Sequence, residues 1–331
     1  MLLDVRSLTI ELPTPAGWVR PIQDVSLQIA PGEALGLVGE SGSGKTMLSL
    51  ALMGLLPPGS RVSGEAWFEV GQAFQPVPSG SSPDHRVNLL SLSPDQLRAL
   101  RGHSLAMIFQ EPMTALNPVL RVSAQIEEAV RAHEPHLPRD EVRRRTVAAL
   151  ERAAVPEPAL RARQFPHQLS GGLRQRALIA MALTGSPRLL IADEPTTALD
   201  VTVQEQILEL LARLQRDLGL ALLFITHDLA VVAEVASRLA VLYAGRIVEE
   251  GPAHELLIHP RHPYTQGLLA ASPSLDRRQL VPIPGSVPRL DALPPGCAFE
   301  PRCPYRLPEC SFALPDLRPA NPDHRARCIL V

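Results

Sequence analysis

Apolar runs of five or six residues recur along the chain, and each ends at polar residues or at a glycine-rich turn. Such runs are typical of strands buried on both faces, and here they cover residues 34–38, 105–109, 188–192, 220–225 and 239–243. Helical segments lie between them, most clearly an apolar one at 47–56 and an amphipathic one at 201–218. Strands that alternate with helices, with polar residues at the strand ends, predict an open α/β sheet with a ligand crevice.

The first part of the chain has a different pattern. Residues 3–12 and 19–29 alternate apolar and polar positions around a Pro-Thr-Pro-Ala-Gly turn, which predicts an antiparallel hairpin. Residues 61–70 predict a further strand, and residues 246–250 a short final one. The segment 71–90 is rich in Gly, Pro and Ser, and we interpret it as a disordered insert to which no function is assigned.

A helical pattern dominates residues 122–163. Within residues 139–150 the charged side chains fall on one face, and the other face carries Val142, Thr146, Ala149 and Leu150. We interpret the charge run as a solvated face rather than a binding patch.

Composition narrows the class of protein. A chain of 331 residues with 45% hydrophobic content predicts one large domain with an appendage, or two modest domains. The net charge of −2 gives no basic field, so nucleic acid is not a favoured partner. No basic region precedes the first apolar residues, so we expect no secretory signal. The most apolar region, 218–244, is interrupted by charged residues and is not expected to cross a bilayer, which favours a soluble cytoplasmic protein.

The segment between the first apolar strand and the helix that follows it has the pattern G-x-x-x-x-G-K-T, which is typical of a phosphate-binding loop. Its residues are Gly39, Glu40, Ser41, Gly42, Ser43, Gly44, Lys45 and Thr46. A glycine-rich turn at a helix N-terminus points backbone N–H groups and the helix dipole at an anion. The Lys45 ammonium is expected at the β- and γ-phosphates and the Thr46 hydroxyl at Mg²⁺.

Lys45 is the only lysine, so the other 31 of the 32 basic residues are arginine. A general compositional drift toward arginine is one interpretation of that bias. Arginine is a wide planar fork and lysine a compact charge on a flexible stem, so the two are not interchangeable in a tight phosphate site. A lysine kept at this one position therefore favours a nucleotide site.

Acidic and amide side chains follow the other apolar strands. Asp193 follows the strand at 188–192 and is expected to hold Mg²⁺ with Thr46. Glu194 beside it is free to act as the general base that polarises water. His227 and Gln110 also stand at strand ends, where a plain hydrogen bond to the backbone is the alternative role for each.

A second glycine-containing segment, Ser170-Gly171-Gly172, opens another predicted helix within the run Leu169–Arg176. It is a second helix N-terminus suited to an anion. One chain thus carries two phosphate-binding ends, although one nucleotide is expected.

These motifs together resemble the ATP-binding subunits of ABC transporters over residues 2 to about 251. The Walker A motif matches Gly39–Thr46, the Walker B motif Leu190–Glu194, and the signature sequence Leu169–Arg176. The Q-loop matches Gln110, the D-loop Ala198-Leu199-Asp200, and the H-loop His227.

The resemblance implies an ATPase that uses ATP and Mg²⁺. Gln110 would then contact Mg²⁺, and His227 the γ-phosphate. It also implies that Ser170, Gly171, Gly172 and Gln175, with Asp200, close on the ATP held by a second ATPase subunit, identical or paralogous. The fold implied is a P-loop NTPase of ABC type with an antiparallel β subdomain and a helical arm at about 111–165.

A narrower resemblance joins the chain to the oligopeptide, dipeptide and nickel importer branch of this family. It rests on residues 107–118, 262–265 and 296–304, whereas residues 52–57 and 173–176 look like the first of the two ATPases that such importers carry. It implies two transmembrane permease subunits, one of whose coupling helices docks at Gln110 and the arm, and an extracytoplasmic solute-binding protein as an indirect partner. The chain would lie on the cytoplasmic face of the inner membrane, with the ATPase domain at 1–251 and an irregular extension at 252–331.

The extension carries all four cysteines of the chain, Cys297, Cys303, Cys310 and Cys328. Their spacing contains no C-x-x-C pair, so the usual structural zinc pattern is absent. Four cysteines suffice for a Cys₄ iron–sulfur cluster, and some members of the branch carry a [4Fe–4S] cluster on a similar tail. Zinc and free thiols are the alternatives, and a structural use is favoured over a redox use.

One family feature is missing. ABC ATPases stack adenine on an aromatic residue of the first hairpin, but the corresponding strand position here is Leu12, and the nearest aromatic is Trp18. Trp18 is the candidate, with a packed core residue as its alternative role.

The sequence therefore predicts an ATP-hydrolysing subunit of an importer of peptides or related solutes. Its first alternative is import of nickel or another metal chelate. A soluble ABC ATPase that acts on ribosomes or DNA, and a redox sensor based on the cysteines, are the alternatives from other classes.

Overall fold

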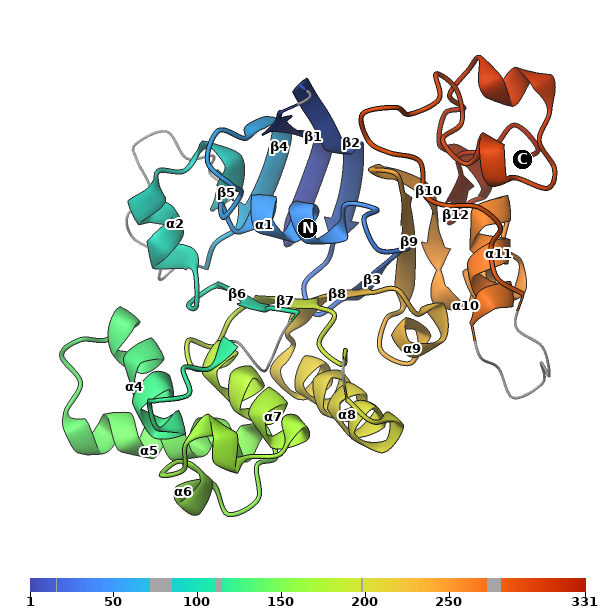
Figure 1. The fold of residues 1–331 in the computed structure, drawn as a ribbon. Helices are drawn as coiled ribbons and strands as arrows, with labels where there is room; N and C mark the ends of the chain where they lie inside the picture. The colour runs from blue at the N-terminus through green and yellow to red at the C-terminus, as the bar shows by residue number, and fades with distance from the viewer. Residues whose placement is uncertain (16, 72–84, 111–114, 198, 273–280) are drawn as a thin grey trace.

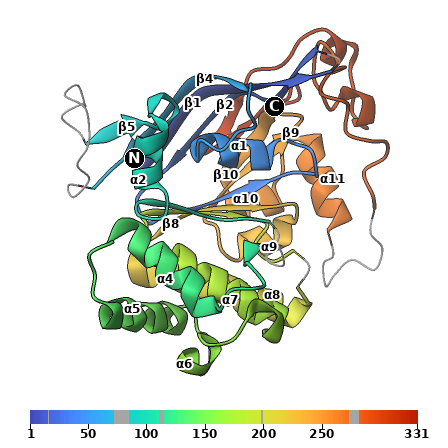
Figure 2. The same cartoon turned by 60° about the vertical axis from the view of Figure 1, so that its left-hand side comes forward.

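The computed structural model describes residues 1–331 except 16, 72–84, 111–114, 198 and 273–280 (Figure 1). Within these residues the chain forms two sheets, one of four strands and one of eight. Helices lie on both faces of the larger sheet, and the smaller sheet covers the face that carries α1 (Figures 1 and 2). The predicted open α/β architecture with an antiparallel subdomain is confirmed.

The larger sheet has the order β11-β12-β10-β9-β3-β8-β7-β6. Strands β9, β3, β8, β7 and β6 are parallel to one another, and their bounds are Ala34–Val38 (β3), Leu105–Ile108 (β6), Leu189–Asp193 (β7), Ala221–Thr226 (β8) and Arg238–Tyr243 (β9). Successive side chains of β3 point to opposite faces: Leu35 and Leu37 enter the core toward the smaller sheet, and Ala34 and Val38 the core toward the helices. Burial on both faces explains the unbroken apolar runs.

The smaller sheet has the order β2-β1-β4-β5 and is antiparallel. Its strands are Leu3–Thr14 (β1), Gly17–Ile29 (β2), Arg61–Glu69 (β4) and Arg86–Asn88 (β5). The predicted hairpin is confirmed, and its ladder runs from Leu3 opposite Ile29 to Thr14 opposite Gly17.

The disordered insert predicted at 71–90 is wrong at its C-terminal end. Residues 86–88 pair with β4 as β5, and Val87 and Leu89 are buried. The apolar residues within 86–92 provide this packing. The Gly-, Pro- and Ser-rich composition of the preceding residues led to the prediction of disorder for the whole segment. Residues 72–84 lie outside the described residues.

Helix α1 (Lys45–Leu52) ends four residues earlier than predicted. Gly54 adopts a left-handed φ of 61°, and the Leu55 N–H and Gly54 N–H groups donate to the carbonyls of Leu50 and Ala51. This pair of bonds is a Schellman motif, which ends a helix at a glycine.

Helix α2 (Pro94–Leu100) lies on the same side of the large sheet as α1, and its Leu100 enters the same core (Figure 1). On the other side lie α4 (Val122–His133), α5 (Arg139–Arg152), α6 (Pro158–Arg161), α7 (Gly171–Ala182), α8 (Val201–Leu218) and α9 (Leu229–Ala233) (Figure 1). In α5 the buried residues are those predicted, Val142, Thr146, Ala149 and Leu150. The predicted helical pattern over 122–163 is thus confirmed.

The C-terminal segment is more regular than predicted. It contains α10 (Ala253–Ile258), α11 (Pro263–Ala271), β11 (Arg318–Asn321) and β12 (His324–Ala326). Strand β12 pairs with β10 (Arg246–Pro252) and so extends the large sheet. The expected boundary at residue 251 falls inside β10.

In the part of the chain that the structure describes, no helix combines the length and the apolar character needed to cross a membrane.

Candidate functional site

The phosphate-binding loop connects β3 to the N-terminus of α1 and packs tightly against its surroundings. A Cβ atom on Gly39 would lie 2.2 Å from the Leu242 carbonyl oxygen. Gly44 has a φ of 110°, and a Cβ there would lie 2.2 Å from the Pro21 carbonyl oxygen. Both positions therefore require glycine, and they fix the loop close to its neighbouring strands.

Lys45 lies inside this loop and is 5% exposed. Its Nζ donates to the carbonyl oxygens of Gly39 at 2.7 Å and Glu40 at 3.0 Å. Burial lowers the pKa of the ammonium, and the nearby Glu194, Asp193 and Glu40 carboxylates partly oppose this. Phosphate oxygens that entered the loop would take over the role of the two carbonyls.

Asp193, at the end of β7, is placed to complete a cation site. It is 1% exposed; burial raises the pKa of its carboxyl, while hydrogen bonds from Thr46 and Ser49 lower it. Among the described residues, Asp193 Oδ1 and Ser43 Oγ are buried polar atoms without a hydrogen-bond partner. The orphaned carboxylate oxygen fits a ligand for Mg²⁺, and the orphaned hydroxyl fits a hydrogen-bond donor to phosphate.

The side chains of Gln110 and His227, from the ends of two other strands, meet at the Glu194 carboxylate. Gln110 Nε2 donates to Glu194 Oε2 at 3.1 Å, and His227 Nδ1 lies 3.5 Å from Oε1. They follow β6, β7 and β8, so the parallel sheet brings them together. Glu194 itself has a φ of 48°, an unusual backbone conformation for a residue that is not glycine.

The cluster also sets the charges of its members. The pKa of Glu194 falls to about 2, chiefly through its interaction with His227 and also through a hydrogen bond from Thr197, against the effect of burial. Glu194 in turn raises the pKa of His227. The carboxylate is therefore ionised, as a general base must be.

Sequence reasoning missed two members of this site. Thr197 Oγ1 donates to Glu194 Oε2 at 3.0 Å, and Ser49 contributes a hydrogen bond near Asp193. The position of Thr197, three residues after Glu194, is one signal that could have indicated it. For Ser49 the signal is a polar side chain within an apolar stretch of helix.

The signature segment lies elsewhere. Ser170 is the N-cap of α7, and its Oγ accepts a bond from the Leu173 N–H at 3.4 Å. Gly172 lets α7 approach α8, because a Cβ there would lie 2.6 Å from Val203 Cγ1. Gln175 is buried and, within the described chain, both polar atoms of its side chain have no partner. Helices α1 and α7 lie on opposite faces of the large sheet (Figures 1 and 2).

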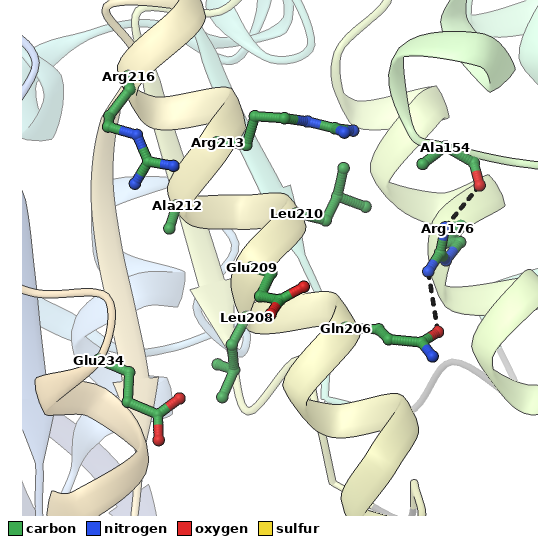
Figure 3. A pocket seen from close by; sticks show the side chains of 10 residues that line it. All are labelled: Ala154, Arg176, Gln206, Leu208, Glu209, Leu210, Ala212, Arg213, Arg216 and Glu234. Carbon is green, nitrogen blue, oxygen red and sulfur yellow. Dashed lines mark hydrogen bonds between the residues drawn. The ribbon is translucent and has the colours of Figure 1, made fainter.

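Asp200 is the N-cap of α8, where its Oδ1 accepts a bond from the Val203 N–H at 3.0 Å. Ala198, the first residue of the predicted D-loop, lies outside the described residues. Arg176, the last residue of the signature run, bonds the carbonyl of Ala154 and the side chain of Gln206 at the edge of a cavity of about 600 Å³ (Figure 3). This cavity is lined from α7, α8 and their surroundings and does not include the phosphate loop.

Trp18 lies on β2 and is 44% exposed. The Arg61 guanidinium stands 3.9 Å from the centroid of its ring. Arg61 thus covers one face of the Trp18 ring, so adenine would have to stack on the other face. Leu12 is partly buried on β1.

The four cysteines, although far apart in sequence, line one small cavity together with His262 and Phe299. Burial raises the pKa of Cys297 to about 11, and it also raises the pKa values of Cys303 and Cys328. In the described residues no group of three or more His, Cys, Asp or Glu side chains has the arrangement of a metal site.

A second cavity, of about 590 Å³, opens between β6, α4 and α7. Its lining is mostly apolar and includes Phe109, whose side chain is 46% exposed. Phe109 was predicted to be part of a buried strand; β6 instead ends at Ile108, and Phe109 turns outward before Gln110.

Comparison with known proteins identifies the family. The ABC transporter family matches residues 22–197, and the C-terminal region of oligopeptide/dipeptide transporters matches residues 248–310. The chain is 47% identical to a Brucella ovis protein described as a "putative peptide import ATP-binding protein", over 99% of this chain and 96% of that protein. A Brucella abortus protein with the same description is 45% identical over 92% of this chain and 87% of its own length.

Solved structures agree. The dimeric ABC transporter cassette MJ0796 has a TM-score of 0.64 at 26% identity, over 76% of this chain and 98% of that chain. Its dimer bound to ADP and phosphate has a TM-score of 0.63 at 27% identity, with the same coverage. With the phosphate-binding loop, the Glu194 cluster and the signature helix in place, these matches show that the chain belongs to the ABC transporter family of ATP-binding proteins.

Proposed function

We propose that this chain binds and hydrolyses ATP to energise an importer of peptides or related small solutes. The observation that carries the proposal is the convergence of Gln110 and His227 on the Glu194 carboxylate, beside the buried Lys45 and Asp193. Relatives described as peptide import ATP-binding proteins, matched over nearly their whole length, supply the cargo class.

In this proposal the loop Gly39–Thr46 surrounds the phosphates, and Lys45 replaces its bonds to the loop carbonyls by bonds to the β- and γ-phosphates. Thr46 and Asp193, with Gln110, would hold Mg²⁺, which offsets phosphate charge. Glu194 polarises the attacking water, and His227 contacts the γ-phosphate while its proton helps to keep Glu194 ionised. Trp18 is the proposed contact for adenine.

Hydrolysis would need a second ATPase subunit, identical or paralogous. The N-terminus of α7 and the phosphate loop of the same chain lie on opposite faces of the sheet (Figure 1). Ser170, Gly171 and Gly172, with Gln175 and Asp200, are therefore proposed to contact ATP held by the other subunit. The dimeric assembly of the cassette MJ0796 supports this arrangement.

The membrane partners would be two permease subunits, one of which would dock a helix at Gln110 and the helical arm, beside the apolar cavity that Phe109 lines. An extracytoplasmic solute-binding protein would act indirectly. The chain would then lie at the cytoplasmic face of the inner membrane, with residues 1–251 as the ATPase domain and residues 252–331 as the extension. Nickel or another metal chelate is the alternative cargo.

The cysteine cavity supports a further part of the proposal. Cys297, Cys303, Cys310 and Cys328 line one cavity, and they would supply the four thiolates of a [4Fe–4S] cluster whose role would be to cross-link the tail. Cysteine ligands must be deprotonated, so a cluster would displace the protons of three thiols whose pKa burial raises, and its bonds to sulfur would have to offset that cost. Iron and acid-labile sulfide in anaerobically purified protein would support the cluster, whereas zinc alone or no metal would contradict it.

Uptake measured in cells whose native chain is replaced by the Glu194→Gln variant tests the function. We expect loss of uptake of labelled di- or oligopeptides, or of nickel if the alternative cargo is right. The matched control is Glu209→Gln on the exposed face of α8, which should transport normally. Normal uptake of both cargoes in the Glu194→Gln cells, or a chain that sediments with membranes without its permease subunits, would contradict the proposal.

A further inference from the structure

The C-terminal extension contacts the phosphate-binding loop directly, at its second residue. Arg302 Nη1 and Nη2 donate to the two carboxylate oxygens of Glu40 at 2.7 and 3.0 Å, which makes a two-pronged ion pair. The backbone N–H of Glu40 donates to Tyr264 Oη at 2.8 Å. Both the side chain and the main chain of one loop residue are thus held by residues more than 220 positions away.

The contact is built into the protein interior rather than lying on the surface. The Arg302 side chain is 4% exposed. Its Nε donates to the Pro284 carbonyl at 2.9 Å, and Nη1 also reaches Tyr243 Oη at 3.3 Å. The rings of Tyr243, Tyr264 and Phe299 pack against one another with centroid separations of 4.5 to 5.4 Å. The guanidinium lies 5.9 Å from the ring centroids of Tyr243 and Phe299. Packing and hydrogen bonds therefore fix the guanidinium before any nucleotide arrives.

The extension is itself anchored to the sheet beside the loop. Glu249 on β10 is fully buried and accepts bonds from the backbone N–H groups of Arg261 and His262 at 2.6 and 3.0 Å. His324 Nε2 on β12 lies 2.7 Å from the same carboxylate. The start of α11, which carries Tyr264, is consequently fixed relative to β10.

Glu40 needs such a partner because of its position. It places a carboxylate in a loop that must receive a polyphosphate, and its carbonyl also holds Lys45 at 3.0 Å. A carboxylate without its cation would repel the phosphates, and an ion pair that loses one buried partner leaves a costly charge. Pairing with Arg302 cancels that charge and fixes the loop.

We propose that Arg302 and Tyr264 are positioning residues for ATP binding, so that the C-terminal extension forms the outer wall of the nucleotide site. The inference rests on the proposed binding of ATP. The two residues act through Glu40: Arg302 neutralises its carboxylate, and Tyr264 fixes its peptide N–H.

The test is the dissociation constant of Mg-ATP for the full chain, measured by calorimetry in a Glu194→Gln background that prevents turnover. Arg302→Gln is expected to weaken binding about tenfold, Arg302→Lys less, since it keeps the charge but not the two-pronged geometry. Tyr264→Phe, which keeps the ring packing, should weaken it about threefold. Arg289→Gln is the matched control, because Arg289 is an exposed arginine of the same extension paired with Asp291.

The double variant Glu40→Gln with Arg302→Gln separates positioning from folding. It removes the unpaired carboxylate, so binding should return to within about threefold of the parent. A purely structural role of Arg302 predicts instead that the double variant binds as weakly as Arg302→Gln and melts at as low a temperature. If the parent protein binds Mg-ATP and the Arg302→Gln variant binds it equally well, the inference is overturned and the proposed function still stands. Parent protein that does not bind Mg-ATP would overturn the proposed function and the inference with it.

Discussion

Helix α1 begins at a glycine in the left-handed conformation and has no side-chain cap, whereas α7 begins at Ser170, whose hydroxyl accepts a bond from its own helix. Both ends are proposed to bind phosphate. The α1 end is surrounded by charge: Lys45 lies in its loop, and Asp193 and Glu194 lie beside it. At the α7 end the residues proposed to contact phosphate, Ser170, Gly171 and Gly172, offer a hydroxyl and backbone N–H groups.

This difference separates chemistry from recognition. Groups that can move a proton or hold a cation gather at the α1 end, and the α7 end can add hydrogen-bond donors and the positive end of a helix dipole. Because the two ends lie on opposite faces of one sheet (Figure 2), a complete site would require α1 of one subunit and α7 of another. Variants that act on one end alone can test this division.

The largest expected effect is at the α1 end. In Glu194→Gln protein assembled with its partners, ATP turnover should fall ~10²–10⁴-fold because the group that polarises water is lost. Binding of Mg-ATP should stay within about threefold of wild type, since the amide keeps the shape of the carboxylate. Phosphate release and calorimetry measure the two quantities. Normal turnover would remove Glu194 from its proposed role.

The next effect should appear at the α7 end. Ser170→Asp keeps a good N-cap but adds a negative charge. Two charges about 6 Å apart at an effective dielectric of about 20 repel by ~3 kcal/mol, which predicts a ~10²-fold fall in turnover of the assembled protein. Mg-ATP binding to the isolated chain should not change. Ser170→Asn, a neutral cap, is the control, and weaker binding by the isolated Ser170→Asp chain would place the α7 end at its own nucleotide.

A subtler change concerns the charge inside the loop. Lys45→Arg retains a cation but replaces a compact ammonium by a planar fork, and the site holds that ammonium between two carbonyl oxygens. We expect Mg-ATP binding to weaken about tenfold. The reverse exchange at an exposed position, Arg216→Lys on α8, should have no effect. Equal affinity in the Lys45→Arg protein would mean that only the charge matters.

The smallest expected effect is on the pH dependence of the free energy of unfolding, and it comes from Glu194 and His227 at the α1 end. The pKa of Glu194 is lowered to about 2, so its contribution is present above its ordinary value of 4.5 and is lost as the pH falls toward 2. The pKa of His227 is raised, so its contribution is present below 6.5 and is lost as the pH rises through the raised value.

The stabilising effect of this pair should therefore be greatest between about pH 4.5 and 6.5. His227 is 60% exposed, so the effect should stay below about 1 kcal/mol. Thermal melting of wild type and His227→Ala across this range measures it. A difference that grew steadily above pH 8 would contradict the assignment.

Local signals explain what could be predicted from the sequence. The phosphate loop, Asp193 and Glu194 follow directly from a buried strand, and parallel strands bring Gln110 and His227 to the same edge. The hairpin and the buried face of α5 follow from periodicity in the same way. The end of α1 differs from the prediction because the apolar pattern continues to Leu56, past the left-handed Gly54 that ends the helix.

Contacts between distant segments could not be predicted. Arg302 is 262 positions from Glu40, and no local pattern indicates that they meet. The pairing of β12 with β10, and the gathering of four cysteines at one cavity, likewise depend on the path of the C-terminal extension. Proline-rich composition there suggested irregular chain, but buried groups such as Glu249 and His324 order it.

The single lysine has a practical consequence for handling the protein. All other basic side chains that carry a permanent positive charge are arginines, so Lys45 is the sole side-chain amine for acylating reagents, aldehydes and amine cross-linkers. It lies 5% exposed inside the phosphate loop, so its acylation would report directly on whether the loop is occupied. A fluorescent amine reagent would label this side chain and the exposed N-terminal amine of Met1, so the label carried by the Lys45 peptide is the occupancy signal.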